Sequence, residues 1–547
     1  MGFYFGCLVF GDDLVDRLRC PMSSWIVRRS VPYSSRWQAK ACLKECGVTG
    51  LERPLRSAPN WQASATPDRV TYTPVASSEI GRRIAEFAGR NRVPYSSLSS
   101  STVRDRRDGF DRLGRGSCPK LMSREHFCGE SMNKISRILI ATLSLLGAVT
   151  AAADDDLPKS RAEALAMEAK DALPLTNFYD PPAPLGARTP GELIRSEPFQ
   201  GYSLPPGAHA VRILYVSRSL DGAPVAASGV VLIPAGPPPR RGWPIIAWAH
   251  GTSGVARMCA PSLMKDVAYG SEGLMPMVAA GFVVVATDYA GLGTPGPHLY
   301  DNKIAQANDV VYSIPAARAA VPLLGRGWVA IGHSQGGVAV WGVAELEAKL
   351  EDPAYRGAIS VAGDMSYESF EAHDAVTFDT ITNLYWPLTA FGVKASYPSL
   401  DVARMLTPVM LERYEDVTSK GCWYYAYAAA AEIGHQAAVR PGWNKIPELA
   451  RYNRDSRSTD KPIRGPLMVL AGDDDASVNF ANIQAGVEKV CRNHLPVEFV
   501  HRPGLDHDPL MEKTIDLQLD WVRARLDGKP WSSNCKSADT VPHGTAP

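Results

Sequence analysis

A serine between glycines is the residue whose setting points most directly to chemistry. Ser334 lies in the stretch Gly332-His333-Ser334-Gln335-Gly336, which has the pattern Gly-x-Ser-x-Gly. A short apolar run, 328–331, precedes it, and a helix-like stretch, 338–350, follows it. A serine on a tight turn between a strand and a helix projects its hydroxyl clear of the backbone, and the flanking glycines keep the two elements from clashing. The pattern predicts Ser334 as a nucleophile.

A serine nucleophile needs a base, and the base needs an acid that orients it. After a serine on such a turn, the expected chain order is serine, acid and then histidine. Asp475 follows the apolar run 467–471, and we predict it as the acid because it lies in the loop beyond a strand end. His507 lies in the loop after the last apolar run, 497–500, and we predict it as the base.

Neighbouring titratable residues leave alternatives open. Asp364, which follows the preceding strand, is the rival acid, whereas Asp473 and Asp474 are typical of a solvated turn. His333, next to the serine, is interpreted as a packing residue whose ring points away from Ser334. Two further histidines are interpreted as surface or packed residues: His494 and His501.

The loop after the apolar run 244–249 is a second source of catalytic groups. It reads His250-Gly251-Thr252-Ser253-Gly254. Acyl transfer requires backbone N–H groups that face the developing negative charge of an oxyanion. We predict the amides of Gln335, at the start of a helix, and of Thr252, with Gly251 as the second choice in this loop. His250 is expected to hold the loop in place.

Strands and helices alternate along most of the chain. Residues 210–216 and 226–233 predict a hairpin around Asp221-Gly222, and further apolar runs predict strands at 244–249, 282–287, 358–362, 467–471 and 497–500. Helices are predicted at 160–173, 262–280, 309–324 and 335–350. This alternation predicts an α/β fold with a mostly parallel central sheet flanked by helices.

The alternation stops between residues 365 and 464. This interval is rich in aromatic residues and contains helix-like segments such as 425–433. Because it lies between two strands of the sheet and after the predicted nucleophile, we predict a helical cap over the site. Most of its aromatic side chains are expected to form the core of the cap, and some to line a pocket.

The first 131 residues are rich in arginine and serine and show no sustained period of 2 or 3.6. We predict that residues 1–131 are a non-native or disordered extension. From Met132 onward, basic residues are followed by an apolar run, 138–149, and by Ala151-Ala152-Ala153. This order is typical of a signal peptide, so residues 132–153 are predicted to be one. The mature domain would then span residues 154–547 and be secreted or periplasmic.

Charge and cysteine content narrow the function classes. The formal net charge of +1 gives no overall field that would draw the chain to nucleic acid or to an anionic membrane. Four of the ten cysteines follow residue 154. An even number in an exported chain predicts two disulfides, with three connectivities possible. These four are Cys259, Cys422, Cys491 and Cys535.

Several stretches together resemble the secretory lipase family, the lipase-A-like branch of the α/β-hydrolases. They are Phe178-Tyr179-Asp180-Pro181-Pro182, residues 250–254 with Cys259-Ala260-Pro261-Ser262, residues 288–296, residues 332–337, residues 472–475 and Asp506-His507. The chain departs from the family pattern at Asn479, where a proline often follows the acid loop, and at Asp508-Pro509. Both departures leave loop shape and substrate preference open.

The resemblance implies an α/β-hydrolase fold with a helical cap and a triad of Ser334, Asp475 and His507. It also implies that Cys259 pairs with Cys422, and Cys491 with Cys535. The expected activity is hydrolysis of a small-molecule or lipid carboxylic ester by an exported serine lipase or esterase. We expect the activity to need no metal and no cofactor. We also expect neither nucleic acid nor an obligate protein partner to bind. Transient contact with a lipid interface fits the substrate class.

Other readings of the same motifs are a serine peptidase, an acyltransferase or a binding protein that has lost catalysis. A peptidase or an acyltransferase could use the same triad on the same fold. The serine, acid and histidine in the expected order argue against a binding protein.

Overall fold

The computed structural model describes residues 157–365, 379–458 and 460–535, together with four short strands nearer the N-terminus. The chain divides into two units, Met1–Arg124 and Glu125–Pro547. In the first unit, β1 (Gly6–Leu8) pairs with β2 (Arg17–Arg19), and β3 (Trp61–Thr66) pairs with β4 (Arg69–Pro74), both antiparallel. The rest of the predicted extension and the predicted signal peptide, residues 132–153, lie outside the described residues.

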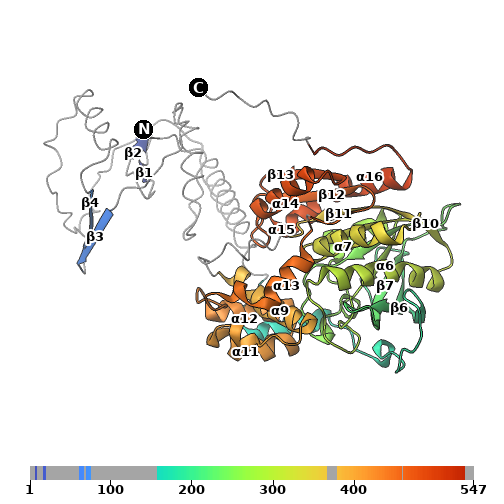
Figure 1. Cartoon of the computed structure of the whole chain (residues 1–547), viewed down its shortest axis with the longest axis horizontal. Coiled ribbons are helices and arrows are strands. Elements are labelled where there is room, and N and C mark those ends of the chain that lie inside the picture. The colour runs from blue at the N-terminus through green and yellow to red at the C-terminus, as the bar shows by residue number, and fades with distance from the viewer. Residues whose placement is uncertain are drawn as a thin grey trace, which may run out of the picture. The chain divides into compact units, whose positions relative to one another are not determined.

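The second unit is built on a nine-stranded sheet with the order β13-β12-β11-β10-β8-β9-β7-β6-β5 (Figure 1). Neighbouring strands from β9 to β13 run parallel, and β5, β6 and β7 pair antiparallel at the other edge. The strands are β5 (Leu193–Phe199), β6 (His209–Arg218), β7 (Pro224–Ile233), β8 (Trp243–Ala249), β9 (Val283–Thr287), β10 (Leu324–His333), β11 (Tyr355–Val361), β12 (Leu467–Gly472) and β13 (Val497–Arg502).

Helices cover both faces of this sheet because its central strands are apolar on both sides. One core cluster joins the sheet to α6 (Lys303–Ala320), α7 (Gln335–Leu350) and α14 (Phe480–Arg492). The opposite face packs against α5 (Met275–Ala279), α15 (His507–Lys513) and α16 (Ile515–Leu526). The predicted α/β class, with a mostly parallel sheet between helices, is confirmed.

The prediction of one continuous helix over residues 262–280 is wrong. The segment begins with a 3-10 turn at Pro261–Leu263, and helix resumes only at Gly270–Leu274, as a π-helical turn that leads into α5. Between these elements, Val267 and Ala268 have φ angles of 60° and 66°, which no right-handed helix accommodates. The Asp266 carboxylate accepts the Ala268 N–H and stabilises this turn.

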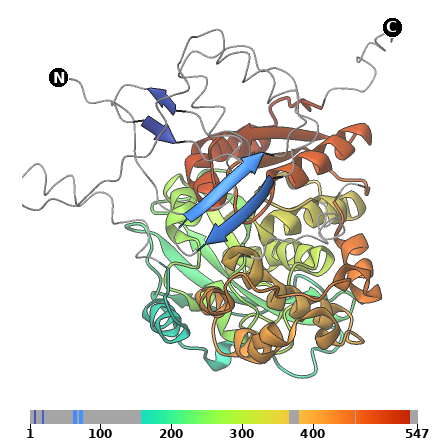
Figure 2. The same cartoon turned by 90° about the vertical axis from the view of Figure 1, so that its left-hand side faces the viewer.

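Helices fill the described part of the interval between β11 and β12, where the cap was predicted. They are α9 (Thr380–Ser396), α10 (Val402–Met405), α11 (Pro408–Ser419), α12 (Trp423–Ile433) and α13 (Pro447–Ser456). Figures 1 and 2 show these helices grouped together beside the sheet and its flanking helices. Aromatic side chains, including Trp386, Tyr397 and Trp443, are buried in a core of their own. Phe370 and Phe378 lie outside the described residues.

Covalent and polar links fasten the cap to the loop after β8. Cys259 pairs with Cys422, as the family resemblance implied. The Trp423 N–H, at the start of α12, donates to the Ser253 carbonyl at 3.0 Å. The Glu168 carboxylate on α4 (Arg161–Asp171) accepts the Cys422 N–H at 3.0 Å, which satisfies an amide at the start of α12. The start of α12 is therefore held from two sides.

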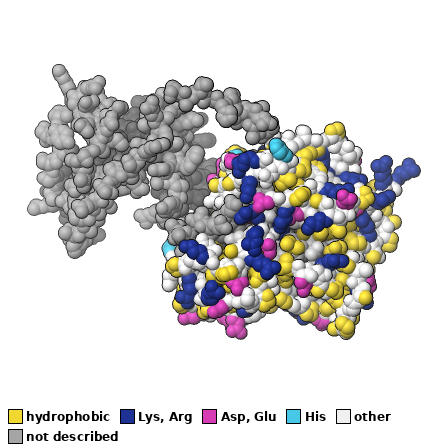
Figure 3. Space-filling view, viewed as in Figure 1, with side chains coloured by type: hydrophobic (Ala, Val, Ile, Leu, Met, Phe, Trp, Pro, Cys, Tyr) yellow, Lys and Arg dark blue, Asp and Glu magenta, His cyan; other side chains and the backbone are white. Residues whose placement is uncertain are grey.

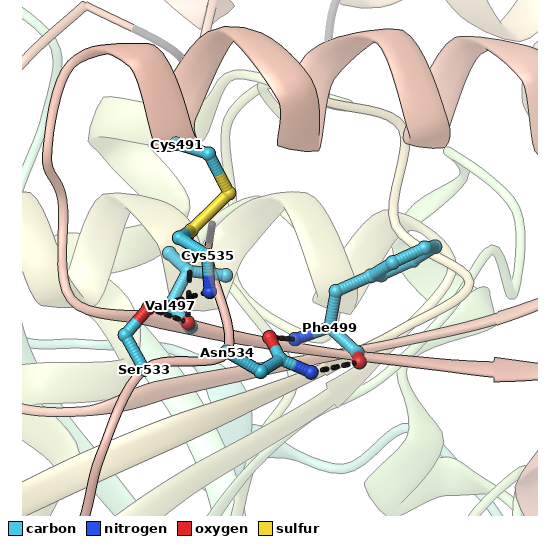
Figure 4. Close-up of a disulfide and its surroundings, with 6 residues drawn as sticks. All are labelled: Cys491, Val497, Phe499, Ser533, Asn534 and Cys535. Atoms are coloured by element: carbon cyan, nitrogen blue, oxygen red, sulfur yellow. Dashed lines mark hydrogen bonds between the residues drawn. A yellow bond between two sulfur atoms is a disulfide. The ribbon is translucent and has the colours of Figure 1, made fainter. Parts of the chain in front are cut away.

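The other implied pairing, Cys491 with Cys535, is also present and lies at a sheet edge. Figure 4 shows the segment around Cys535 running beside edge strand β13. The Asn534 side chain accepts the Phe499 N–H at 2.8 Å and donates to the Phe499 carbonyl at 2.8 Å. Because the amide pairs with both backbone groups of one residue, it replaces a neighbouring strand at that position.

The visible face of the second unit carries interspersed basic and acidic side chains (Figure 3). No broad area of one sign stands out there, which fits the balanced net charge. Within the described ranges, no helix is both long enough and apolar enough to cross a bilayer.

Changing Gly336 to alanine should destabilise the second unit, because the sheet and α7 touch at this residue. A Cβ on Gly336 would lie 1.8 Å from the Ala249 carbonyl oxygen. We expect Gly336→Ala to lower the free energy of unfolding by about 1–3 kcal/mol or more. Thermal melts should show it against Gly327→Ala, whose Cβ meets only the movable tip of Leu526 at 3.0 Å. Equal melting temperatures for the two variants would contradict this packing.

Candidate active site

Ser334 lies at the sharp turn between β10 and α7. Its φ of 56° and ψ of −118° are unusual for a residue with a side chain, and such strain is typical of a serine held at a functional turn. The Ser334 N–H donates to the Val361 carbonyl of β11 at 2.9 Å, which fixes the turn to the neighbouring strand. A Cβ on Gly332 would lie 2.0 Å from the Gly336 carbonyl oxygen. The turn therefore closes only with glycine at this position.

The structure brings two of the predicted triad residues into direct contact. His507 Nδ1 lies 2.8 Å from Asp475 Oδ2. The other carboxylate oxygen of Asp475 accepts the N–H groups of Ser477 and Val478 at 2.9 and 2.7 Å, and the carboxylate is fully buried. These bonds fix the acid in one orientation. Since the carboxylate only accepts, Nδ1 carries the proton and Nε2 is left as the basic nitrogen.

The charge around His507 favours its protonated form. Burial alone would lower the pKa of this imidazole. The hydrogen bond and negative charge of Asp475, together with the charges of Asp508 and Asp506, outweigh burial and raise the pKa above 6.5. This environment stabilises the imidazolium that forms when a base accepts a proton.

His507 Nδ1 is bonded to Asp475 rather than to one of the rival acids. Asp473 accepts the Gly504 N–H and lies 3.2 Å from His501 Nε2, so both residues belong to a surface contact. Asp474 is exposed, as is His494. Asp364 follows β11. His507 Nδ1, which the acid must orient, is bonded to Asp475.

The two predicted oxyanion amides are not taken up by hydrogen bonds to backbone groups of the described residues. Within the described ranges, neither the Thr252 nor the Gln335 N–H donates to another backbone group. Gln335 is the first residue of α7, where N–H groups have no intrahelical acceptor and the helix dipole favours an anion. Thr252 Oγ1 lies 2.8 Å from the Tyr300 hydroxyl, which fixes the side chain of that loop residue. Both amides thus remain available to an anion.

His250 is fully buried beneath this loop. Its ring nitrogens lie 2.6 Å from the Gly251 carbonyl and 3.2 Å from the Asp288 carbonyl. Burial lowers the pKa of His250 to about 4, so the ring is neutral near pH 7 and tethers the loop.

His298 is a neighbour of the site that the motifs did not single out. Gln335 Nε2 donates to His298 Nε2 at 3.1 Å, and His298 Nδ1–H donates to the Ala290 carbonyl at 3.2 Å. Burial, followed by the charge of His250, lowers the pKa of His298 to about 3, which keeps the ring neutral. His298 and Tyr300 lie just beyond the family-like stretch 288–296, and that proximity was the one available signal.

Acidic side chains gather beside the base. Asp508 follows His507 directly, and burial raises the pKa of its carboxyl. Burial, then the charges of Asp508, Glu512 and Asp266, raises the pKa of Glu272 to about 8. Glu272 is therefore largely protonated near pH 7, which reduces the negative charge near the triad.

His333, His507 and Asp508 form a cluster of metal-ligating residue types beside the triad candidates. Donor atoms of His333, His507 and Asp508 lie within 4.8 Å of one another. Donors around a tetrahedral zinc ion lie about 3.4 Å apart. The orientation of both rings is explained without a metal ion, because His507 Nδ1 is bonded to Asp475 and His333 Nε2 to a carbonyl. The arrangement fits the triad and its surroundings better than a metal site.

A cavity of about 690 Å³ lies between the cap and the sheet unit. Its lining includes His298, Gln306, Leu220 and Tyr397, but none of Ser334, Asp475 or His507. The cavity is thus separate from the triad candidates, and its lining residue His298 accepts a hydrogen bond from the Gln335 side chain.

Replacing Asp475 with asparagine should impair Ser334 and shift its pH dependence. The variant loses the charge that raises the pKa of His507, so the acid limb of the reactivity profile should move to lower pH. The maximal rate should fall by about four orders of magnitude, because the imidazole loses its orienting acceptor. The rate of labelling by a fluorophosphonate from pH 5 to 9 measures both effects. Asp474→Asn, in the same loop, should leave the profile unchanged; an unchanged Asp475→Asn profile would contradict the assignment.

Comparisons with known proteins bear on the fold. No protein-family model matches the chain, and no curated protein matches its sequence. Among solved structures, Candida antarctica lipase A is 16% identical, with a TM-score of 0.54 over 66% of this chain and 89% of that one. A ligand-bound rice cell wall degrading esterase LipA from Xanthomonas oryzae is 17% identical, with a TM-score of 0.50 over 63% and 100%. A putative hydrolase from Legionella pneumophila is 16% identical, with a TM-score of 0.52 over 62% and 100%.

At these identities the likeness concerns the fold. The chain has the α/β-hydrolase fold, and its resemblance to lipase A extends from short motifs to the three-dimensional structure.

Proposed function

We propose that this chain is an exported serine hydrolase of carboxylic esters, a lipase or esterase. The observation that carries the proposal is the pair formed by His507 and the buried Asp475, in a loop that contacts the turn of Ser334. The N–H groups of Thr252 and Gln335, which donate to no backbone group within the described ranges, add the donors that an acyl-transfer site requires. The fold shared with lipases and an esterase supports the same reaction class.

The proposed mechanism is acyl transfer through an acyl-enzyme. His507 Nε2 takes the Ser334 hydroxyl proton while Ser334 Oγ attacks the ester carbonyl. The amides of Thr252 and Gln335 stabilise the oxyanion of the tetrahedral intermediate. His507 then gives its proton to the departing alcohol. Water, activated by His507, attacks the acyl-enzyme and releases the carboxylic acid.

Aromatic side chains of the cap support an apolar substrate. Trp423 stacks on Tyr427 with ring centroids 5.6 Å apart, and both are only partly buried. The backbone N–H of Trp423 bonds to Ser253, next to the proposed oxyanion residue Thr252. Because the proposed substrate is an apolar ester, transient contact with a lipid interface is part of the proposal.

Export is the second part of the proposal. The signal-peptide pattern at residues 132–153 precedes the hydrolase unit, and two disulfides fit an oxidising compartment.

Ester hydrolysis should depend on the Ser334 hydroxyl. We expect the chain expressed from Asp154 to hydrolyse acyl esters, and Ser334→Ala to lose at least about a thousandfold in kcat, because no other group forms the acyl-enzyme. The measurement is a series of esters from butanoate to palmitate, whose profile separates a lipase from a short-chain esterase. A folded parent that is inert on every ester would overturn the proposal, and peptide amides and acyl acceptors would be assayed next.

Export should leave a mature N-terminus near Asp154, where the Ala-x-Ala pattern ends. Mass spectrometry of the protein recovered from the periplasm or medium measures this directly. Peptides from residues 1–131 in the exported protein would contradict the signal peptide predicted at residues 132–153.

A further inference from the structure

We propose that His333 is a positioning residue that holds the loop of His507 against the strand of the nucleophile. This inference rests on the proposed function, because it assigns His507 as the base. His333 is the last residue of β10 and directly precedes Ser334. Its Nε2 lies 3.2 Å from the backbone carbonyl oxygen of His507. One side-chain hydrogen bond therefore joins the residue next to the nucleophile to the backbone of the candidate base.

The protonation state of His333 follows from its surroundings. The ring is fully buried. Burial, and then the charge of His507, lowers the pKa of His333 well below its usual value, so the ring is neutral. The carbonyl of His507 can only accept, so the single ring proton lies on Nε2. Nδ1, also buried, has no hydrogen-bond partner in the described part of the chain, which agrees with an unprotonated nitrogen there.

The position of this bond determines what it can do. Asp475 orients the His507 ring through Nδ1, but it contacts only the side chain. His333 instead holds the backbone of His507, whose N–H donates to Asp506 Oδ1 at the start of α15. The ring is thus oriented by one residue and the Cα position of His507 by another. Because His333 and Ser334 are consecutive, His333 sets the separation of base and nucleophile.

Packing supports the same role. The rings of His333 and His507 have centroids 4.5 Å apart, and the Tyr269 ring meets His333 edge-on at 5.6 Å. The Tyr269 hydroxyl is so close to Gly251 that a Cβ there would lie 2.1 Å from it. Tyr269 therefore bridges His333 and the loop that carries the Thr252 amide. A ring at residue 333 is packed between the base loop and the oxyanion loop.

Two substitutions separate the hydrogen bond from the packing. Glutamine carries its amide nitrogen as many bonds from Cα as Nε2 of histidine, whereas asparagine carries it as far as Nδ1. His333→Gln can therefore reach the His507 carbonyl, and His333→Asn cannot. We expect His333→Asn to lower kcat roughly 10- to 100-fold with little change in KM, since a shift of about 1 Å at the base costs that much. His333→Gln should recover most of the loss.

The rate of Ser334 labelling by a fluorophosphonate provides a readout that needs no ester substrate. We expect the labelling rate to fall in the same order, from the parent to His333→Gln and then to His333→Asn. A parent that is labelled at Ser334 but hydrolyses no ester would refute the proposed function and leave this inference testable. Equal rates in the parent and His333→Asn would overturn the inference. Equal losses in both variants would also overturn it, because the effect would then come from packing alone.

A measurement on the unsubstituted protein covers the case in which the variants do not fold. Histidine-selective ¹⁵N labelling and long-range ¹H–¹⁵N spectra report which ring nitrogen carries the proton. We expect one ring with a proton on Nε2 that stays neutral from pH 5 to 9. A proton on Nδ1 of His333, or titration of this ring in that range, would exclude the bond to the His507 carbonyl.

Discussion

The rest of the structure depends on one constraint, the close approach of β10 and α7, which meet at Ser334, to the neighbouring strands β8 and β11. The turn from β10 into α7 has contacts with β8 through Gly336 and with β11 through Gly337, whose Cβ would lie 2.6 Å from Gly363. A side chain at either glycine would push the sheet and helix apart. Because the strands are hydrogen-bonded to each other, the position of this turn also fixes the loops that follow β8, β12 and β13.

Those loops supply the Thr252 amide and the side chains of the candidate acid and base. Parallel strands end at the same edge of a sheet, so residues distant in sequence gather there. Thr252 follows β8, Asp475 follows β12 and His507 follows β13. The cap adds a further restraint, since the disulfide of Cys259 with Cys422 ties it to the segment after the oxyanion loop. The site is thus assembled from the sheet below and held by the cap beside it.

Much of this could be predicted from local patterns. Apolar runs identified the strands, and chain order identified Ser334, Asp475 and His507 as candidates because each follows a strand or turn signal. The prediction of a helix at 262–280 was wrong because nothing in the composition of this segment indicates the positive φ angles of Val267 and Ala268. Contacts such as those of His298 with Gln335 and of His333 with His507 join residues far apart in sequence. No periodicity or motif encodes them.

The segment around Cys535 has a consequence for the order of assembly. Strand β13 is the sheet's last strand and leads into the loop of His507, and its outer side is paired by Asn534. Until residues 533–535 have emerged and Cys491 has been oxidised, the backbone groups of β13 remain open to strands of other chains. Protection from intermolecular pairing therefore arrives late in synthesis and depends on the redox state of the compartment. The edge that this segment covers is also the strand that leads into the loop of His507, the candidate base.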